Sequence, residues 1–288
     1  MAVPWWLTNV VLPVGVLLVV MWPTERTGFR LLRDWGVPEP RPDQVDEAVR
    51  YLWQRRILYA VLFVVVPPLV DRVLWHDAGQ PVLKIFMPLL VAMLVAEVVA
   101  TVRPVSGVRV ASLDPRGWRD LVPRWAVVVA GVLVVLTVTW SVAGLVARPW
   151  ADRFAAALPP NDEMSPATGW LARGFAAAAV ALMVLLVHLA VRRPSVADAA
   201  VDAALRTRTA RVAVGIGIGW LGLAVAQAAD RVRFLLNLGP REPGLPAWFV
   251  SWFGSASQAV GVVAVLGAVV CWIWVANPTH RALTAARR

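Results

Sequence analysis

The sequence has little of what most metal-binding and redox sites are built from. It contains one cysteine, Cys271, and three histidines among 288 residues. A single cysteine excludes an intrachain disulfide and a cysteine metal cluster. His76 and His280 are separated by an odd number of the membrane spans predicted below, which puts them on opposite membrane faces. We therefore expect no metal site.

Motifs of the common enzyme classes are also missing. There is no H-E-x-x-H, no G-x-S-x-G and no Walker A loop. The pattern Gly217-x-Gly219-x-x-Gly222 fits a dinucleotide fingerprint, but no strand precedes it and it lies inside an apolar stretch. Gly215-x-x-x-Gly219 in the same stretch is typical of close helix packing instead. The sequence thus gives no support for an enzyme, and we expect neither a catalytic residue nor a cofactor.

Charged residues make up only 16% of the chain, whereas 59% of its residues are hydrophobic. Soluble domains run nearer 25% charged. The apolar residues come in blocks of the length that crosses about 30 Å of hydrocarbon. These blocks predict an all-α polytopic bundle of about seven transmembrane helices, formed by residues 1–288 as a single integral membrane domain. The expected spans are 5–22, 57–75, 82–102, 125–147, 174–191, 212–230 and 256–276.

The basic residues are distributed unevenly between the loops. Loops 23–56, 103–124 and 192–211 and the tail after 276 together hold 20 of the 28 Lys and Arg residues, and the alternate loops hold 8. The side richer in basic residues is cytoplasmic by the positive-inside rule. We expect an outside N-terminus, a cytoplasmic C-terminus and a multi-pass location in the cell (cytoplasmic) membrane. The net charge of +10 is then explained by basic loops beside anionic lipids. We expect the lipid bilayer, and not nucleic acid, to be the partner of these loops.

The cytoplasmic loops carry helical signals of their own. Residues 36–42 are rich in proline and predict a stiff linker. Asp43, a possible helix cap, precedes an amphipathic pattern at Val45, Ala48, Val49, Leu52 and Trp53. Asp114-Pro115 and Ser195-x-x-Asp198 indicate two further helix starts, the second as a capping box. We expect these helices to lie on the inner membrane face and to continue into the next span.

Glu97 and His188 are the ionisable residues most embedded in apolar sequence. Five or six residues separate each one from the proline that ends its span, so both have a similar depth. They are candidates for an intramembrane polar pair between the third and fifth spans. The alternative is that each one reaches the nearby interface by itself.

A faint internal repeat relates the second and sixth spans. Residues 46–55 resemble residues 202–211, and the two spans end in Asp71-Arg72-Val and Asp230-Arg231-Val. Asp71, Arg72, Asp230 and Arg231, with Gln227 one turn deeper, are candidates for a polar outer mouth. The alternative is a pair of interfacial ion pairs that only end each helix.

The run Arg116-Gly-Trp-Arg-Asp-Leu-Val-Pro-Arg-Trp125 and the Arg-, Ala- and Val-rich style of the chain resemble uncharacterised multi-spanning membrane proteins of high-GC, actinobacterial-type bacteria. That resemblance implies the membrane fold and no particular activity. Seven spans with related second and sixth helices also resemble the 3+1+3 parallel-repeat plan of SWEET-type sugar facilitators.

Two functions remain open on the sequence. The first is a non-enzymatic accessory or partner-binding membrane component, whose cytoplasmic helices hold a protein partner. The second is a small-solute permease built on the repeat, for a solute that the sequence does not identify. Since the middle of each span is nearly all Val, Leu, Ala and Gly, and a permease needs converging polar groups there, the first function is favoured.

Overall fold

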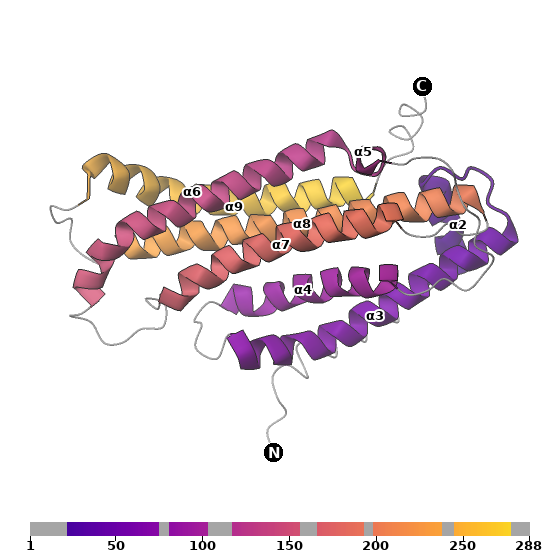
Figure 1. Ribbon diagram of the computed structural model, residues 1–288, viewed down its shortest axis with the longest axis horizontal. Coiled ribbons are helices and arrows are strands. Elements are labelled where there is room, and N and C mark those ends of the chain that lie inside the picture. Colours follow the sequence, from indigo (N-terminus) through magenta and orange to yellow (C-terminus); the bar gives the residue numbers. More distant parts are fainter. Residues whose placement is uncertain are drawn as a thin grey trace, which may run out of the picture.

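The computed structural model describes residues 22–74, 81–102, 117–155, 166–192, 198–237 and 245–277. Within these residues all regular structure is helical and there is no strand, so the predicted all-α class is confirmed (Figure 1). The helices are α2 (Glu25–Asp34), α3 (Pro42–Leu74), α4 (Pro81–Val102), α5 (Trp118–Leu121), α6 (Arg124–Ala155), α7 (Pro166–Arg192), α8 (Ala199–Leu236) and α9 (Ala247–Ala276).

Four of these helices are long and apolar enough to cross a membrane. They provide the segments Arg124–Pro149, Arg173–Arg192, Ala199–Leu236 and Ala247–Ala276, and α4 contains a shorter apolar stretch, Leu89–Thr101. These features are those of a membrane protein. The first expected span, 5–22, lies outside the described residues, and the count of seven spans stays a prediction.

Helix α8 lies at the centre of the bundle and packs against α6, α7, α9 and α4 (Figure 1). Its most apolar window is 83% buried within the protein, whereas the corresponding window of α9 is 22% buried. With 38 residues and about 1.5 Å of rise per residue, α8 is about 57 Å long. That exceeds the hydrocarbon thickness of about 30 Å, so α8 extends beyond the apolar layer.

Glycines allow α9 to approach α8 closely, which confirms the packing role expected for this stretch. A Cβ added to Gly222 would lie 2.5 Å from the Ala268 Cβ and 2.9 Å from the Ala264 carbonyl oxygen. Gly215 and Gly219 both lie against the Trp272 ring. Side chains therefore fill the middle of this interface.

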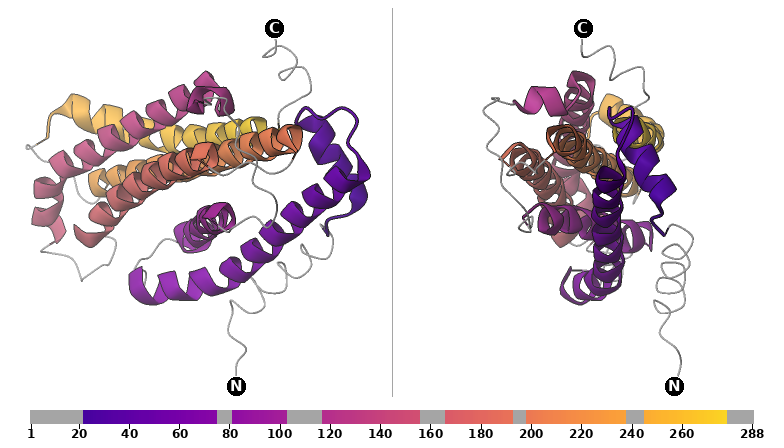
Figure 2. Two further views of the ribbon diagram at one scale, coloured as in Figure 1. Left: turned by 45° about the vertical axis from the view of Figure 1, so that its right-hand side comes forward. Right: turned by 90° about the vertical axis from the view of Figure 1, so that its right-hand side faces the viewer.

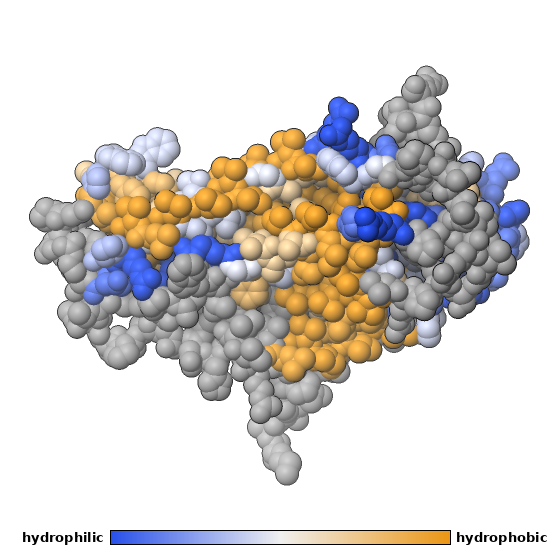
Figure 3. Space-filling view, in the orientation of Figure 1, coloured by the Kyte–Doolittle hydropathy of each residue, from blue (hydrophilic) through white to orange (hydrophobic). Residues whose placement is uncertain are grey.

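The outward faces of the bundle are apolar, as a lipid-facing surface requires. On α6, Val128, Val135 and Val142 recur every seven residues and are exposed, and Val263 and Leu266 on α9 are 69% and 62% exposed. Figure 3 shows hydrophobic side chains across the middle of the molecule and hydrophilic ones near both ends. Soluble monomers rarely expose a continuous apolar belt of this kind.

Two of the three predicted loop helices do continue into the apolar stretches that follow them, as α3 and α8. The third expected start, Asp114-Pro115, lies outside the described residues. The expected starts of α3 and α8 were wrong. Helix α3 begins at Pro42, which places Asp43 inside the first turn and not at the N-cap. The Arg41 N–H donates a hydrogen bond to Gln44 Oε1 at 2.8 Å. Proline suits the first helical position because it has no N–H to satisfy.

The start of α8 also differs from the expected capping box. Asp198 is the N-cap itself and not the third residue of a helix capped by Ser195. Its Oδ1 accepts from the N–H groups of Ala200 and Val201 at 3.0 and 3.2 Å. A helix capped from its own N-cap residue satisfies these amides directly.

Helix α2, which the sequence did not predict, forms a small layer with the first turns of α3 and α8. The layer has a core of its own, formed by Leu31, Leu32, Trp35, Val37, Val45, Ala48, Tyr51, Leu52, Val201, Ala204 and Leu205. The linker 36–41 folds back between α2 and α3, and Gly36 takes a φ of 101°, a left-handed conformation that glycine adopts without strain. We call this unit the α2–α3 layer.

Successive long helices run in opposite directions. The starts of α3, α6 and α8 lie at the end of the bundle that carries α2, and the ends of α7 and α9 lie there too (Figures 1 and 2). Arg206 of α8 bonds the carbonyl of Val191 near the end of α7, and Arg211 bonds that of Leu121 in α5. The segments predicted to be cytoplasmic thus gather at one end.

Candidate functional site

A buried ion pair joins α3 to α4. Glu97 on α4 is completely buried, and Arg55 on α3 is 4% exposed. Arg55 Nη1 forms an ion pair with Glu97 Oε2, and the Tyr59 hydroxyl donates a hydrogen bond to Glu97 Oε1. Both carboxylate oxygens therefore have partners on α3.

The same arginine connects α3 to the central helix α8. Arg55 Nη2 donates to Thr209 Oγ1 at 2.9 Å, and the Tyr51 hydroxyl lies 3.1 Å from the same oxygen. Thr209 Oγ1 itself donates to the Leu205 carbonyl at 2.8 Å. Because its proton is used there, Thr209 accepts from both Arg55 and Tyr51. Three helices thus meet in one polar cluster.

The cluster follows from a regular spacing of residues in α3 that was not recognised in the sequence. Tyr51, Arg55 and Tyr59 are four residues apart and lie on one face of α3. Tyr51 and Tyr59 are the two tyrosines of the whole chain, and both flank the same arginine. That regular placement was the available signal. It was missed because Arg55 stands at the predicted edge of a span, where arginines are common for topological reasons.

The electrostatics of the cluster are dominated by positive charge. Arg55 and Arg208 both lie over the Tyr51 ring, with Cζ at 4.3 and 5.3 Å from its centroid. Burial raises the pKa of Tyr51, but the charges of these two arginines, with the hydrogen bonds that Tyr51 makes with Thr209 and Arg208, outweigh burial and lower it overall. The pKa of Arg56 is lowered by burial and by the charge of Arg208.

The cluster holds the three helices together and does not supply a free acid or base. Taking a carboxylate and a guanidinium out of water is costly, and the cost is offset only if the pair has good geometry and its remaining atoms are bonded. Arg55 and Tyr59 give the two carboxylate oxygens of Glu97 one partner each. Losing one partner would leave an uncompensated buried charge.

Glu97 and His188 are not brought together, which corrects the predicted pair. Glu97 faces Arg55 and Tyr59, whereas the His188 side chain is exposed on α7. On α7 the buried residues are Ala179, Leu186 and Ala190. His188 follows Leu186 by two residues, which turns it by about 200° to the opposite side of the helix.

The residues of the predicted outer mouth have different partners from those expected. Asp230 forms an ion pair with Arg233 at 2.7 Å. Arg231 lies within electrostatic reach of Arg148, Arg173 and Asp152 at the junction of α6, α7 and α8. The side chains of Asp71 and Arg72 lie outside the described part of the structure.

Gln227 is 7% exposed, and its Oε1 has no hydrogen-bond partner within the described structure. It lies one turn before Arg231, as the sequence indicated. The environments of the two helices related by the faint repeat differ, since α8 is enclosed and α3 lies at the side of the bundle (Figure 2). Span 5–22, which belongs to one half of the repeat, is outside the described residues, and the repeat stays a prediction.

A second polar group lies where α8 enters the α2–α3 layer. Asp202 and Arg206 form a buried ion pair at 2.7 Å, one turn apart on α8. Asp198 accepts from Gln44 Nε2 at 2.6 Å and from Arg41 Nη2 at 3.0 Å. The hydrogen bond from Gln44, with those from Val201 and Ala200 and the Arg41 charge, lowers the pKa of Asp198 against the smaller effect of burial. These contacts fix the start of α8 against α3.

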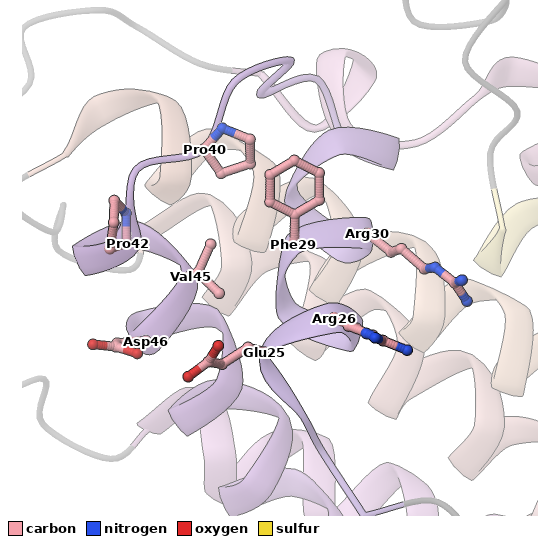
Figure 4. Close-up of a pocket in the computed structure, with 8 residues that line it drawn as sticks. All are labelled: Glu25, Arg26, Phe29, Arg30, Pro40, Pro42, Val45 and Asp46. Carbon is pink, nitrogen blue, oxygen red and sulfur yellow. The ribbon is translucent and has the colours of Figure 1, made fainter.

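The α2–α3 layer has a surface hollow of about 620 Å³. Phe29 and Val45 form its apolar part, with Pro40 and Pro42 beside them (Figure 4). Its remaining lining residues are charged: Glu25, Arg26, Arg30 and Asp46. Within the described ranges, no group of three or more His, Cys, Asp or Glu side chains is placed to hold a metal ion.

Comparison of the chain with protein-family models, with curated proteins and with solved structures found no match. Its function is therefore argued from its own geometry.

Proposed function

We propose that the chain is a seven-span protein of the cytoplasmic membrane with its N-terminus outside and its C-terminus inside. Two observations support this topology. The long helices alternate in direction, and the end that gathers α2 and the starts of α3 and α8 is the end with the arginine-rich loops. By the positive-inside rule this end faces the cytoplasm.

On this topology, we propose that the protein is a non-enzymatic membrane component whose α2–α3 layer binds a cytoplasmic protein partner. The hollow on the layer carries this proposal. It combines an aromatic anchor, Phe29, which is 40% exposed, with acidic and basic side chains around it. Apolar centres with polar rims are typical of protein interfaces.

The charges around the hollow indicate the chemistry of the partner segment. Glu25 and Asp46 lie together on one side of the hollow, whereas Arg26 and Arg30 point to the other (Figure 4). A complementary segment would place an apolar side chain against Phe29 and Val45, with a basic residue toward the acidic side and an acidic residue toward the arginines. Such pairing fixes orientation and excludes wrong partners.

The packing of α8 favours this function over a permease. The middle of α8 is occupied by glycines whose neighbouring space is filled by Trp272, Ala268 and Met183 from α9 and α7. A solute path needs polar groups that converge near the midplane. Around these glycines, α7 and α9 supply apolar contacts instead.

Site-specific photocrosslinking in intact cells tests the proposed function. A benzophenone amino acid at Phe29 should give a discrete protein adduct, and the same group at Val263, on the lipid-facing side of α9, should give none. Reversing the hollow with Glu25→Arg and Asp46→Arg should remove the adduct. Arg50→Glu, an exposed change elsewhere on α3, should leave it.

Two results would overturn the proposal. One is a benzophenone at Phe29 that gives no protein adduct in correctly inserted protein. The other is an adduct that survives the reversal of Glu25 and Asp46, because binding would then not use the hollow.

A further inference from the structure

Three guanidinium groups lie at the junction of α3 and α8. Arg55 and Arg208 lie over this ring, and Arg56 is close enough to Arg208 for their charges to oppose each other. Within the described residues, Glu97 is the carboxylate that forms an ion pair in this group, and its partner is Arg55. Among the described residues, no carboxylate forms an ion pair with Arg56 or Arg208.

Arg56 and Arg208 are held in place without an anionic partner in the described structure. Both side chains are half-buried. Arg56 Nη1 is closed off from solvent and makes no hydrogen bond to any residue that the structure describes. A buried guanidinium nitrogen with no acceptor is unfavourable, and a second positive charge beside it makes it more so. The pair is therefore incomplete as it stands.

The position of the pair indicates what completes it. Arg56 immediately precedes the predicted span 57–75, and Arg208 lies four residues before the predicted span 212–230. Trp53, one turn before Arg56, is 44% exposed, as aromatic residues are at the membrane interface. This is the level of the lipid phosphates. Guanidinium groups bind phosphate oxygens through paired hydrogen bonds.

We propose that Arg56 and Arg208 form a binding site for the phosphate group of an anion at this face of the membrane. Tyr51 orients Arg208 by its ring and hydroxyl, and Arg55 stays engaged with Glu97 and Thr209. The phosphate of an acidic lipid headgroup and that of a soluble phosphate compound would make the same contacts. The site goes beyond the proposed partner-binding function and does not depend on it.

The test uses the full chain in lipid nanodiscs of phosphatidylcholine, with and without phosphatidylglycerol. Phosphatidylglycerol should raise the unfolding temperature of the unchanged protein. Arg56→Gln with Arg208→Gln should remove most of that rise and weaken the apparent affinity for this lipid roughly tenfold or more, which corresponds to about 1.4 kcal/mol. The matched control is Arg50→Gln with Arg192→Gln, because both arginines are exposed and the net charge changes equally.

Two further arms identify the anion and guard against misfolding. Inorganic phosphate added to phosphatidylcholine nanodiscs should raise the unfolding temperature only if a soluble phosphate reaches the site. If phosphatidylglycerol raises the unfolding temperature and inorganic phosphate does not, the site binds a lipid headgroup. Arg56→Lys with Arg208→Lys keeps the charge but not the paired hydrogen bonds, and should retain part of the rise. The proposal is overturned if neither anion raises the unfolding temperature, or if the control variant loses as much of the rise as the site variant.

Discussion

At the scale of single residues, Arg55 and Glu97 matter most for holding α3, α4 and α8 together. Glu97→Leu leaves the Arg55 guanidinium buried without its counter-charge, and breaking a buried pair in this way costs about 3–5 kcal/mol. We expect a large fall in thermal stability, measured by tryptophan fluorescence in detergent. Arg55→Leu with Glu97→Leu should recover much of the loss, because neither charge is then left alone.

An exposed pair at the start of α3 provides the control. Arg41 and Asp43 are 3.5 Å apart, and both are mostly exposed. Asp43→Asn should change stability by less than about 1 kcal/mol, the usual range for surface pairs. If Glu97→Leu proved as mild as Asp43→Asn, the buried cluster would not be holding α3, α4 and α8 together.

Asp198 should make the start of α8 sensitive to acid. Its pKa is lowered from the ordinary value of 3.8, mainly by the hydrogen bond from Gln44. A carboxylate with a lowered pKa contributes stability in full above its unfolded value, and the contribution is lost as pH falls through the folded value. Hydrogen exchange at residues 199–203 should therefore accelerate below about pH 4.

The variant Asp198→Asn separates this charge effect from helix capping. Asparagine is also a good N-cap, so α8 should still start at the same residue. The variant should, however, lose the contact of the charge with Arg41 and the additional acceleration in acid. An unchanged acid response in Asp198→Asn would assign that response to another group.

At the scale of elements, the close approach of α8 and α9 depends on Gly222. Gly222→Ala places a Cβ against the Ala264 carbonyl and the Ala268 methyl, and a rigid helix backbone cannot move aside easily. Overpacking of this kind typically costs about 1–3 kcal/mol. The measurement is the thermal stability of the purified protein.

Gly131 on α6 is the matched control for that substitution. A Cβ there meets nothing within 4 Å, so Gly131→Ala should be neutral or stabilising by up to about 1 kcal/mol, through helix propensity. Equal effects of the two substitutions would mean that α8 and α9 do not pack as closely as described.

The elements also show what the sequence could and could not predict. The apolar blocks near α4, α6, α7, α8 and α9 were found because a run of about 20 apolar residues can hardly be anything else. Helix α2 was not predicted because the segment 25–34 is short and mostly polar. Its helix is stabilised by the core around Leu31 and Leu32 and not by local sequence features. Packing of this kind lies between distant segments and leaves no local trace.

The candidate site was predicted in part for the same reason. Glu97 stood out because a carboxylate in an apolar run is rare. Its partner could not be chosen from depth alone, since depth does not say which way a side chain points around its helix. His188 has a suitable depth but lies on the exposed face of α7. Arg55 lies at the predicted edge of a span, where arginines are common.

At the scale of the whole molecule, the arrangement separates two tasks. The lipid-facing helices α6, α7 and α9 surround α8, and α8 extends out of the apolar layer into the α2–α3 layer. The hydrogen bonds from Arg55 to Thr209 and from Gln44 to Asp198 lie along this extension and tie α3 and α8 together.

The central claim is that the α2–α3 layer faces the cytoplasm at one end of a membrane-spanning bundle. Labelling with a membrane-impermeant maleimide in intact cells tests it most directly, in a Cys271→Ser background with single cysteines at Arg50 or Ser251. Both positions are exposed and belong to opposite ends of the bundle. The account predicts that Ser251→Cys is labelled in intact cells and that Arg50→Cys is labelled only after the membrane is opened. Labelling of Arg50→Cys in intact cells, with Ser251→Cys protected, would contradict it.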